Sequence, residues 1–517
     1  MNILNKTKST LLVTASLTGI LLLTACAKEL GNSGSIPEAP VFTPSGGPDM
    51  VFYGLTEDGK LNRYNAKAPG TVEASLSITG LQAGERLISI DFRPATLQLY
   101  SLSTNSRLYV ISLINGSLTP IGTAAFSPAL NSTVANIDFN PTVDRIRLVT
   151  HNGQNLRLHP ETGAVVATDG NINGGSNPAI ISIAYTNSKA GATVTDLYDI
   201  DISQKKLYKQ NPPNDGTLSE VGNLGIDFIG KGGFDISPDN MVSLATFTRT
   251  GKTRLHTINL SSGAASYINE IEANLIDIAI PTAPVAYGVD ENNMLQIFDP
   301  TKPQTLISRT ITGLTAGEVI HGIDFRPANG QLYAFAVNAN GSAKLYTINP
   351  SSGAATVVGN GFMTDASATA WAFDFNPTVD RIRLVSNSGQ NLRLNPNDGT
   401  IAATDGNINP AMSMVSGAAY TNNFAGSTST ILYVINNNKL FKQDPPNNGT
   451  LVEVGNLGVT IDGMNGFDIS GRTGMAYAIG SVGNTTHIYT VNLTTGSFTS
   501  AGSLPTKFRA FALGLGL

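Results

Sequence analysis

Cysteine is almost absent from this chain of 517 residues, since Cys26 is the only one. No disulfide can form within the chain, so its stability has to come from packing. Charged residues make up only 13% of the sequence, and the formal net charge is -5. Lys and Arg never form a run, although binding to nucleic acid normally requires clustered basic residues. We therefore expect no nucleic-acid partner.

The sequence also lacks the short motifs of common hydrolases and nucleotide-binding enzymes. No HExxH, GxSxG or Walker A motif occurs. The histidines are His151, His159, His256, His321 and His487. None of them keeps its place in both copies of the repeat described below, so a duplicated catalytic histidine or zinc site is excluded. A site in one copy alone stays open, and we predict no catalytic residue, cofactor or metal.

What is present begins with an export signal. Lys6 and Lys8 precede an apolar stretch over residues 11–23, and Leu23-Thr24-Ala25-Cys26 looks like a bacterial lipobox. This pattern predicts a lipoprotein signal peptide over residues 1–25 and a lipid on Cys26. The alternative is a plain secretory signal with an incidental cysteine. Because Ala27 stands where Asp would retain a lipoprotein in the inner membrane, we expect the outer membrane where the source has two membranes. Residues 26–49 are rich in Gly, Ser and Pro and predict a flexible tether.

The remaining chain is a tandem duplication. IDFNPTVDRIRLV at residues 137–149 returns as FDFNPTVDRIRLV at residues 373–385. GQNLRL, ATDGN, VGNLG and GFDIS also recur at an offset of about 234 residues. We therefore divide the folded part into a first repeat over residues 50–283 and a second over residues 284–517.

Each repeat contains a shorter period. The segments ISIDFRP, ANIDFNP, ISIAYTN, GGFDISP and LIDIAIP follow one another at roughly the spacing of propeller blades. Alternating strands follow each segment, and NG, SG, TG and DG pairs mark tight turns. In Arg145–Val149 the alternation places Ile146 and Leu148 inward and the arginines outward. The pattern predicts an all-β fold, a β-propeller of about ten four-stranded blades, five in each repeat.

Two arrangements of these blades compete. In a single ten-bladed ring, LIDIAI at residues 275–280 pairs with VAYGV at residues 285–289, across a short loop of residues 281–284. FRAFALGL at residues 508–515 then pairs with VFYGL at residues 51–55. The alternative is two five-bladed propellers, which agrees better with the usual four to eight blades. The short loop favours the single ring.

Arginines in the repeated motif are the candidate ligand site. Pairs of arginines with fixed geometry can bind a carboxylate, sulfate or phosphate bidentately. The candidates are Arg145, Arg147 and Arg157 in the first repeat, and Arg381, Arg383 and Arg393 in the second. The competing interpretation is structural: the neighbouring aspartates pair with these arginines and lock the blade. ATDGNIN could suggest a calcium loop, but the EF-hand spacing is absent, which favours an Asx turn. Trp371, the only tryptophan, stands where the first repeat has Ala135, and we expect it in the core.

Taken together, IDFxP, DFNPTVDRIRLV, GQNLRL and ATDGN resemble the bacterial family known as domain of unknown function 4394, over about residues 50–517. The resemblance implies an exported, propeller-like protein and transfers no functional residue. We expect a membrane-anchored scaffold in the cell envelope that binds a protein partner or a glycan. The alternatives are a propeller hydrolase or lyase acting on polysaccharide, and a purely structural envelope protein.

Overall fold

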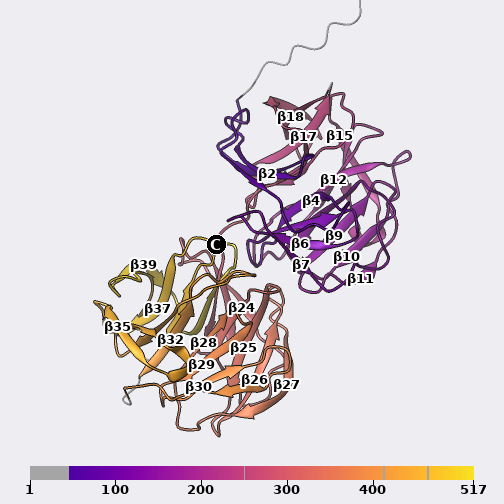
Figure 1. The fold of residues 1–517 in the computed structure, drawn as a ribbon. Helices are drawn as coiled ribbons and strands as arrows, with labels where there is room; N and C mark the ends of the chain where they lie inside the picture. Colours follow the sequence, from indigo (N-terminus) through magenta and orange to yellow (C-terminus); the bar gives the residue numbers. More distant parts are fainter. Residues whose placement is uncertain (1–45, 250, 411–413, 463–464) are drawn as a thin grey trace, which may run out of the picture. The chain divides into compact units, whose positions relative to one another are not determined.

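Alternating strands and glycine turns build ten antiparallel sheets of four strands each, as the sequence predicts (Figure 1). The computed structural model describes residues 46–249, 251–410, 414–462 and 465–517. The predicted signal peptide, Cys26 and most of the predicted tether lie outside these residues. Within them, the only helices are two short 3-10 turns, η1 (Pro213–Asp215) and η2 (Pro446–Asn448).

The first repeat holds five sheets, numbered here as blades 1–5. Blade 1 contains β4 (Leu87–Phe92), β5 (Leu99–Ser103), β6 (Leu108–Ile111) and β7 (Leu118–Ile121). Blade 2 contains β8 (Ala135–Asn140), β9 (Arg145–Thr150), β10 (Asn155–Leu158) and β11 (Val165–Thr168). Blade 3 contains β12 (Ile180–Tyr185), β13 (Leu197–Asp201), β14 (Lys206–Gln210) and β15 (Leu218–Asn223), and blade 4 contains β16 (Phe234–Ile236), β17 (Ser243–Arg249), β18 (Lys252–Ile258) and β19 (Ala265–Ile271). Blade 5 contains β20 (Leu275–Ala279), β1 (Val51–Thr56), β2 (Lys60–Asn65) and β3 (Ala74–Ser77).

The second repeat holds the other five sheets, blades 6–10. Blade 6 contains β24 (Val319–Arg326), β25 (Gln331–Val337), β26 (Ser342–Ile348) and β27 (Ala355–Met363). Blade 7 contains β28 (Trp371–Asn376), β29 (Arg381–Ser386), β30 (Asn391–Leu394) and β31 (Ile401–Thr404). Blade 8 contains β32 (Val415–Tyr420), β33 (Leu432–Asn436), β34 (Lys439–Gln443) and β35 (Leu451–Asn456), and blade 9 contains β36 (Asn465–Ile469), β37 (Ala476–Val482), β38 (Thr485–Val491) and β39 (Phe498–Leu504). Blade 10 contains β40 (Phe508–Leu513), β21 (Ala286–Asp290), β22 (Met294–Phe298) and β23 (Ile307–Thr310).

Strand pairing corrects the prediction of a single ten-bladed ring. β20 pairs with β1 rather than with β21, and Tyr53 lies opposite Ala279. β40 pairs with β21, and Tyr287 lies opposite Ala512. Each repeat therefore returns to its own first strand, in the pattern of the alternative with two five-bladed propellers. The short loop over residues 281–284 misled the prediction because it joins two blades instead of forming a hairpin within one.

The first strands of the blades contact one another in sequence around each repeat. In the first repeat β4, β8, β12, β16 and β20 follow one another, and β20 contacts β4 again. In the second repeat β24, β28, β32, β36 and β40 form the same cycle. We call these ten the inner strands, and the space that they surround in each repeat the channel.

Between blades the core is apolar and repeats from copy to copy. Tyr100 of blade 1 meets the ring of Phe139 of blade 2 edge-on, with ring centroids 5.0 Å apart. Tyr333 and Phe375 repeat this contact in the second repeat at 5.2 Å. Burying such aromatic side chains is the largest favourable contribution that a blade pair can make.

Glycine is required where the outer turn of one blade meets the previous blade. Gly163 has φ of 70°, and a Cβ there would lie 2.8 Å from the carbonyl oxygen of Ile121. Gly399 occupies the same place in the second repeat, with φ of 69°. The TG and DG pairs of the sequence therefore serve the contact between blades as well as the turn.

Candidate functional site

Three buried aspartates converge in each channel. Asp91, Asp138 and Asp235 lie on β4, β8 and β16, and one carboxylate oxygen of each lies within 4.8 Å of the others. The second repeat brings Asp324, Asp374 and Asp468 together in the same way. We call these positions the aspartate level. At this level the other two inner strands of each repeat carry alanine: Ala184 and Ala279 in the first repeat, and Ala419 and Ala512 in the second.

These carboxylates join one inner strand to the next. Asp91 accepts hydrogen bonds from the backbone N–H of Phe92 at 2.7 Å and from that of Phe139, on the next blade, at 2.7 Å. Asp324 does the same with Phe325 at 2.7 Å and Phe375 at 2.8 Å. Because the two repeats share this pattern, the aspartate level has a structural role.

Burial and mutual repulsion raise the pKa of these carboxyls. Burial is the larger cause for Asp91, and the charge of Asp235 adds to it. Burial and the charge of Asp468 likewise raise the pKa of Asp324. Like-charged carboxylates at this distance share protons rather than ionise together. Three carboxylates could hold a divalent cation, but these groups already accept backbone hydrogen bonds, so their geometry is explained without one.

Two residues before the aspartate level, the two channels differ. The first repeat carries Ser89, Asn136, Ser182, Gly233 and Asp277 there, and the second carries Gly322, Ala372, Gly417, Gly466 and Ala510. Asp277 accepts hydrogen bonds from the Ser89 hydroxyl at 2.6 Å and the Asn136 amide at 3.1 Å. Polar side chains therefore fill this level of the first channel, whereas the second has nothing larger than a methyl group.

One residue earlier still lies the end of each channel, which we call the mouth. In the first repeat the mouth residues are Ile88, Ala135, Ile181, Gly232 and Ile276. In the second they are His321, Trp371, Ser416, Asn465 and Arg509. The five equivalent positions are thus aliphatic or small in the first repeat, whose mouth is also lined by Thr133 and Lys231, and polar or aromatic in the second.

β-Bulges aim three of the mouth residues in each repeat. In the second repeat the strand pairing skips His321, Ser416 and Arg509, so each is an extra residue in its ladder. An extra residue re-aims its side chain, and such bulges are frequent beside binding sites. The first repeat has the same bulges at Ile88, Ile181 and Ile276. The backbone device is therefore shared, and only the side chains at it differ.

Two polar groups at the second mouth have no hydrogen-bond partner among the residues that the structure describes. Trp371 Nε1 and Asn465 Oδ1 are buried without a hydrogen bond. The Asn465 amide donates to the Ser416 hydroxyl at 2.7 Å, which leaves that hydroxyl able to donate. Burial, together with the charge of Arg509, lowers the pKa of His321 to about 4, so this imidazole is neutral at pH 7. Within the part of the chain that the structure describes, no carboxylate pairs with Arg509.

The predicted arginine site has a different environment. Arg147, expected to face outward, is buried, and this detail of the prediction is wrong. Its guanidinium donates to Asp169 at 2.6 Å and to Asn155 at 2.8 Å within blade 2, and to Asn214 of blade 3 at 2.7 Å. The guanidinium can be buried because hydrogen bonds from each of its nitrogens compensate for the loss of water.

The other predicted arginines also have partners within the protein, in both repeats. Arg157 pairs bidentately with Asp169, and Arg393 with Asp405. Arg383 repeats the contacts of Arg147, with Asp405 and Asn447 as partners. Arg145 and Arg381 each donate to the carbonyl of the preceding aspartate. A ligand at these arginines stays a prediction, and the geometry already gives them protein partners.

Sequence reasoning missed both the aspartate level and the mouth. The structural interpretation paired the aspartates of the motif with the arginines of their own blade, and nothing local shows that five such strands share one channel. Trp371 was expected in the core and is indeed buried, 5.1 Å from the ring of Phe335. A position-by-position comparison of the two repeats just before each IDF-like segment could have found the mouth.

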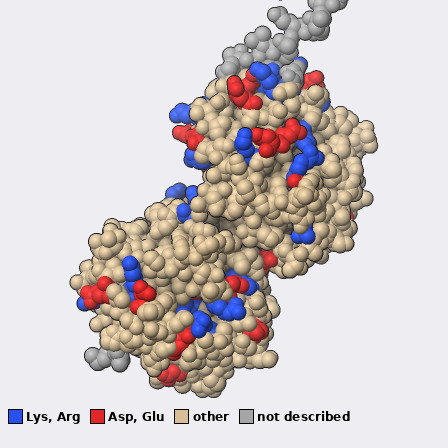
Figure 2. All heavy atoms as spheres, viewed as in Figure 1, with Lys and Arg blue, Asp and Glu red and all other residues tan. Residues whose placement is uncertain are grey.

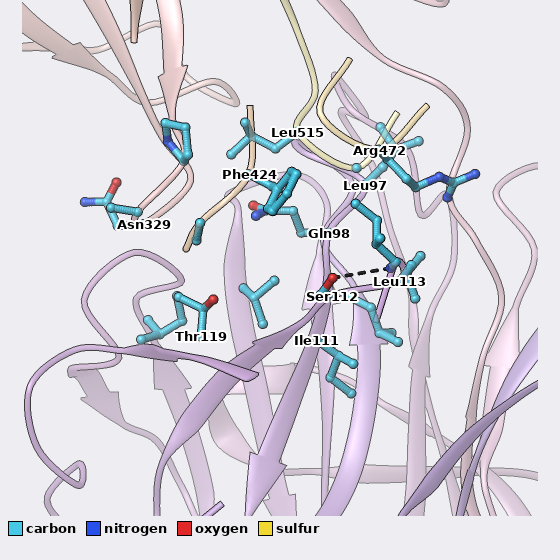
Figure 3. Close-up of a pocket in the computed structure, with 18 residues that line it drawn as sticks. Leu97, Gln98, Ile111, Ser112, Leu113, Thr119, Asn329, Phe424, Arg472 and Leu515 are labelled. Carbon is cyan, nitrogen blue, oxygen red and sulfur yellow. Dashed lines mark hydrogen bonds between the residues drawn. The ribbon is translucent and has the colours of Figure 1, made fainter. Parts of the chain in front are cut away.

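A further pocket is lined by residues of both repeats (Figure 3). Its cavity volume is about 70 Å³, and Leu97, Leu113 and Leu515 lie around it with Phe424. The Ser112 hydroxyl accepts a hydrogen bond from the N–H of Ile114 at 3.3 Å. Within the described residues that line this pocket, Arg472 is the only charged one, so it offers little polar recognition.

Charges of both signs are interspersed on one face of the molecule. Figure 2 shows Lys and Arg beside Asp and Glu on the visible face, with broad uncharged areas between them. Lys206 and Glu220, for example, form a partly exposed ion pair at 2.8 Å.

Comparison with known proteins identifies the family. No protein of curated function matches the sequence. Among solved structures, the Dos1 propeller is 12% identical with a TM-score of 0.25, covering 66% of this chain and 91% of that chain. A protein from Lactobacillus plantarum is 15% identical with a TM-score of 0.27, covering 64% of this chain and 98% of that one. Likeness at this level carries no argument about function. The family model described as "Domain of unknown function (DUF4394)" matches residues 60–279 and again residues 294–514, and the chain therefore belongs to this family.

Proposed function

We propose that the protein is a lipid-anchored component of the cell envelope that binds a glycan at the mouth of its second propeller. The observation that supports binding is the contrast between the two mouths. One repeat carries aliphatic or small residues at the five positions, and the other carries His321, Trp371, Ser416, Asn465 and Arg509. The first repeat forms the same fold with aliphatic or small residues at these positions. A purely structural role therefore does not require the polar and aromatic residues of the second repeat.

The size and polarity of the mouth favour a sugar over a protein surface. Protein interfaces normally have a broad core rich in aromatic and aliphatic residues. The second mouth instead offers hydrogen-bonding groups around a cavity volume of about 10 Å³, which is room for about one water-sized group. A hydroxyl or another small substituent of a sugar fits this opening.

Binding also fits the mouth better than hydrolysis does. Glycoside hydrolysis generally uses two carboxyl groups placed on either side of the bond to be cleaved. Within the described residues that line the second mouth, none is a carboxylate. The aspartates deeper in the channel are buried and hold backbone N–H groups.

The membrane anchor is supported by sequence alone. Leu23-Thr24-Ala25-Cys26 follows an apolar stretch, and the linker after it is rich in Gly, Ser and Pro. A tether of this composition gives the propellers reach from the lipid surface.

A glycan array tests the binding proposal. Residues 27–517 are compared with a variant in which two mouth residues take the identity of the first repeat, Asn465→Gly with Arg509→Ile. We expect the unaltered protein to label a subset of glycans and the variant to lose that labelling while its melting temperature stays within a few degrees. Equal labelling by the two proteins, or none by either, contradicts the proposal.

Membrane fractionation tests the anchor. Cys26→Ser removes the only thiol that can carry a lipid, so we expect the protein to move from the membrane pellet to the soluble fraction. A variant that stays in the membrane fraction excludes Cys26 as the anchor. Ser16→Ala, which leaves the lipobox intact, serves as the control.

A further inference from the structure

We infer that the second mouth recognises the carboxylate of an acidic sugar, with Arg509 as its principal contact. This inference deepens the proposed function and rests on it. It concerns which substituent of the glycan enters the mouth, and it follows from the charge, the donors and the space at this position.

Charge is the first argument. The three fully buried arginines of the chain, Arg93, Arg147 and Arg383, are each paired with an aspartate. Arg509 is half-buried at the mouth, and within the described residues no carboxylate pairs with it. A guanidinium partly withdrawn from water is more favourable with an anion than without one, and an incoming carboxylate would give Arg509 the pairing that the three buried arginines have.

Hydrogen-bonding groups give the second argument. The Trp371 indole N–H is a donor without a partner, and the Ser416 hydroxyl is free to donate because its oxygen already accepts from Asn465. With the guanidinium, the donors outnumber the acceptors at the mouth, which are Asn465 Oδ1 and one ring nitrogen of the neutral His321. An oxyanion accepts at several positions and matches this set. These acceptors suit hydroxyls beside the carboxylate, as on a sugar ring.

Space gives the third argument. Gly322, Gly417 and Gly466 let the inner strands pack closely below the mouth, since a Cβ at Gly322 would lie 2.3 Å from Phe373 Cβ and one at Gly417 would lie 2.9 Å from Asn465 Oδ1. The cavity volume of about 10 Å³ has room for about one water-sized group, such as one oxygen of a carboxylate, and not for a whole sugar ring. The ring would therefore stay outside with its carboxylate inserted.

The deeper aspartates do not oppose an anion strongly. Burial raises the pKa of Asp324, Asp374 and Asp468, and the charge of neighbouring aspartates adds to it for Asp324 and Asp374, so protons neutralise part of their charge at neutral pH. The nearest fixed charge that an anion meets at the mouth is Arg509, which also acts on His321.

Isothermal titration of residues 27–517 with sodium D-glucuronate tests the inference, with D-glucose as the neutral analogue. We expect glucuronate to bind and glucose not to bind at the same concentrations. Arg509→Ile should weaken glucuronate binding by roughly tenfold or more, because a hydrogen-bonded charge pair is lost. Arg472→Ala removes an exposed arginine outside the mouth and should leave binding unchanged.

Further ligands separate this inference from its rivals and from the proposed function. Equal binding of glucose, or unchanged binding by Arg509→Ile, contradicts the role of the carboxylate. Tighter binding of inorganic sulfate contradicts the class of anion, and tighter binding of the dipeptide Ala-Ala contradicts a sugar as its source. If the array shows mouth-dependent binding of neutral glycans alone, the proposed function stands and this inference fails.

Discussion

At the residue scale, duplication lets equivalent side chains be compared in two environments. Arg93 donates to Asp144 at 2.9 and 2.5 Å and to Glu161 at 2.9 Å, and its side chain is completely buried. Its counterpart Arg326 pairs with Asp380, whose side chain is 35% exposed. The same motif therefore gives a buried ion cluster in one repeat and a partly solvated pair in the other.

This difference predicts unequal costs for the same substitution. Arg93→Ala leaves two buried carboxylates without a partner, so we expect it to lower the free energy of unfolding by about 3–5 kcal/mol. Arg326→Ala leaves a carboxylate that water can reach, and its cost should be about 1 kcal/mol. Urea denaturation of the two variants measures both. Equal costs would show that burial of the cluster is not what distinguishes the repeats.

Buried carboxyls predict the direction of the pH dependence. Burial raises the pKa of Asp277 to about 7, and the aspartate levels are raised as well. In the folded state these carboxyls keep protons that the unfolded state releases above about pH 4. The free energy of unfolding therefore falls as pH rises through their folded pKa. Burial lowers the pKa of His321 and His256 to about 4. Because of these histidines the free energy of unfolding rises with pH instead, but only below about pH 6.5.

Between about pH 6.5 and pH 8.5, therefore, only the carboxyls contribute. We expect the melting temperature to fall across this range, with about 1 kcal/mol lost through Asp277 alone. Asp277→Asn should reduce the slope in scanning calorimetry. A melting temperature that rises over the same range contradicts the assignment.

At the element scale, Arg147 and Arg383 connect blades. Arg147 lies on β9 and reaches Tyr185 of β12 at 3.3 Å as well as Asn214 of η1. Arg383 makes the matching contacts with Tyr420 and Asn447. The sequence predicted a lock within one blade, whereas these arginines also hold neighbouring blades together.

Substituting both arginines decides between a lock and a ligand site. We expect Arg147→Ala and Arg383→Ala to cost about 3 kcal/mol each and to add in the double variant, because the two sites share no partner. Arg145→Ala with Arg381→Ala is the control, since these side chains donate only to a neighbouring carbonyl. Unchanged melting with lost binding would instead support a ligand site at these arginines.

Sequence patterns at this scale predicted what depends on neighbours along the chain. Ile146 and Leu148 point into the core as the alternation requires, and Gly163 adopts the positive φ expected of its turn. The bulges at His321 and Arg509 could not be predicted, because a bulge depends on the partner strand. The same holds for Asp91, whose role needs a strand of the next blade.

At the scale of the whole molecule, composition and repeats predicted the fold, but the joining of the ends was wrong. Both arrangements contain the same ten sheets and differ only in whether β20 pairs with β1 or with β21. LIDIAI fits either partner because both offer a similar strand, VFYGL or VAYGV. A choice between such similar partners rests on packing around the channel, which no local pattern describes.

Removing the last strand tests this arrangement directly. Deleting residues 507–517 takes β40 from blade 10 and leaves β21 without its inner partner, whereas blade 5 keeps both β20 and β1. Scanning calorimetry with limited proteolysis should therefore show loss of the second repeat and protection of the first. In a single ring with β40 paired to β1, the deletion would instead expose β1 and destabilise the first repeat. The repeat from which the earliest proteolytic fragments arise distinguishes the two arrangements.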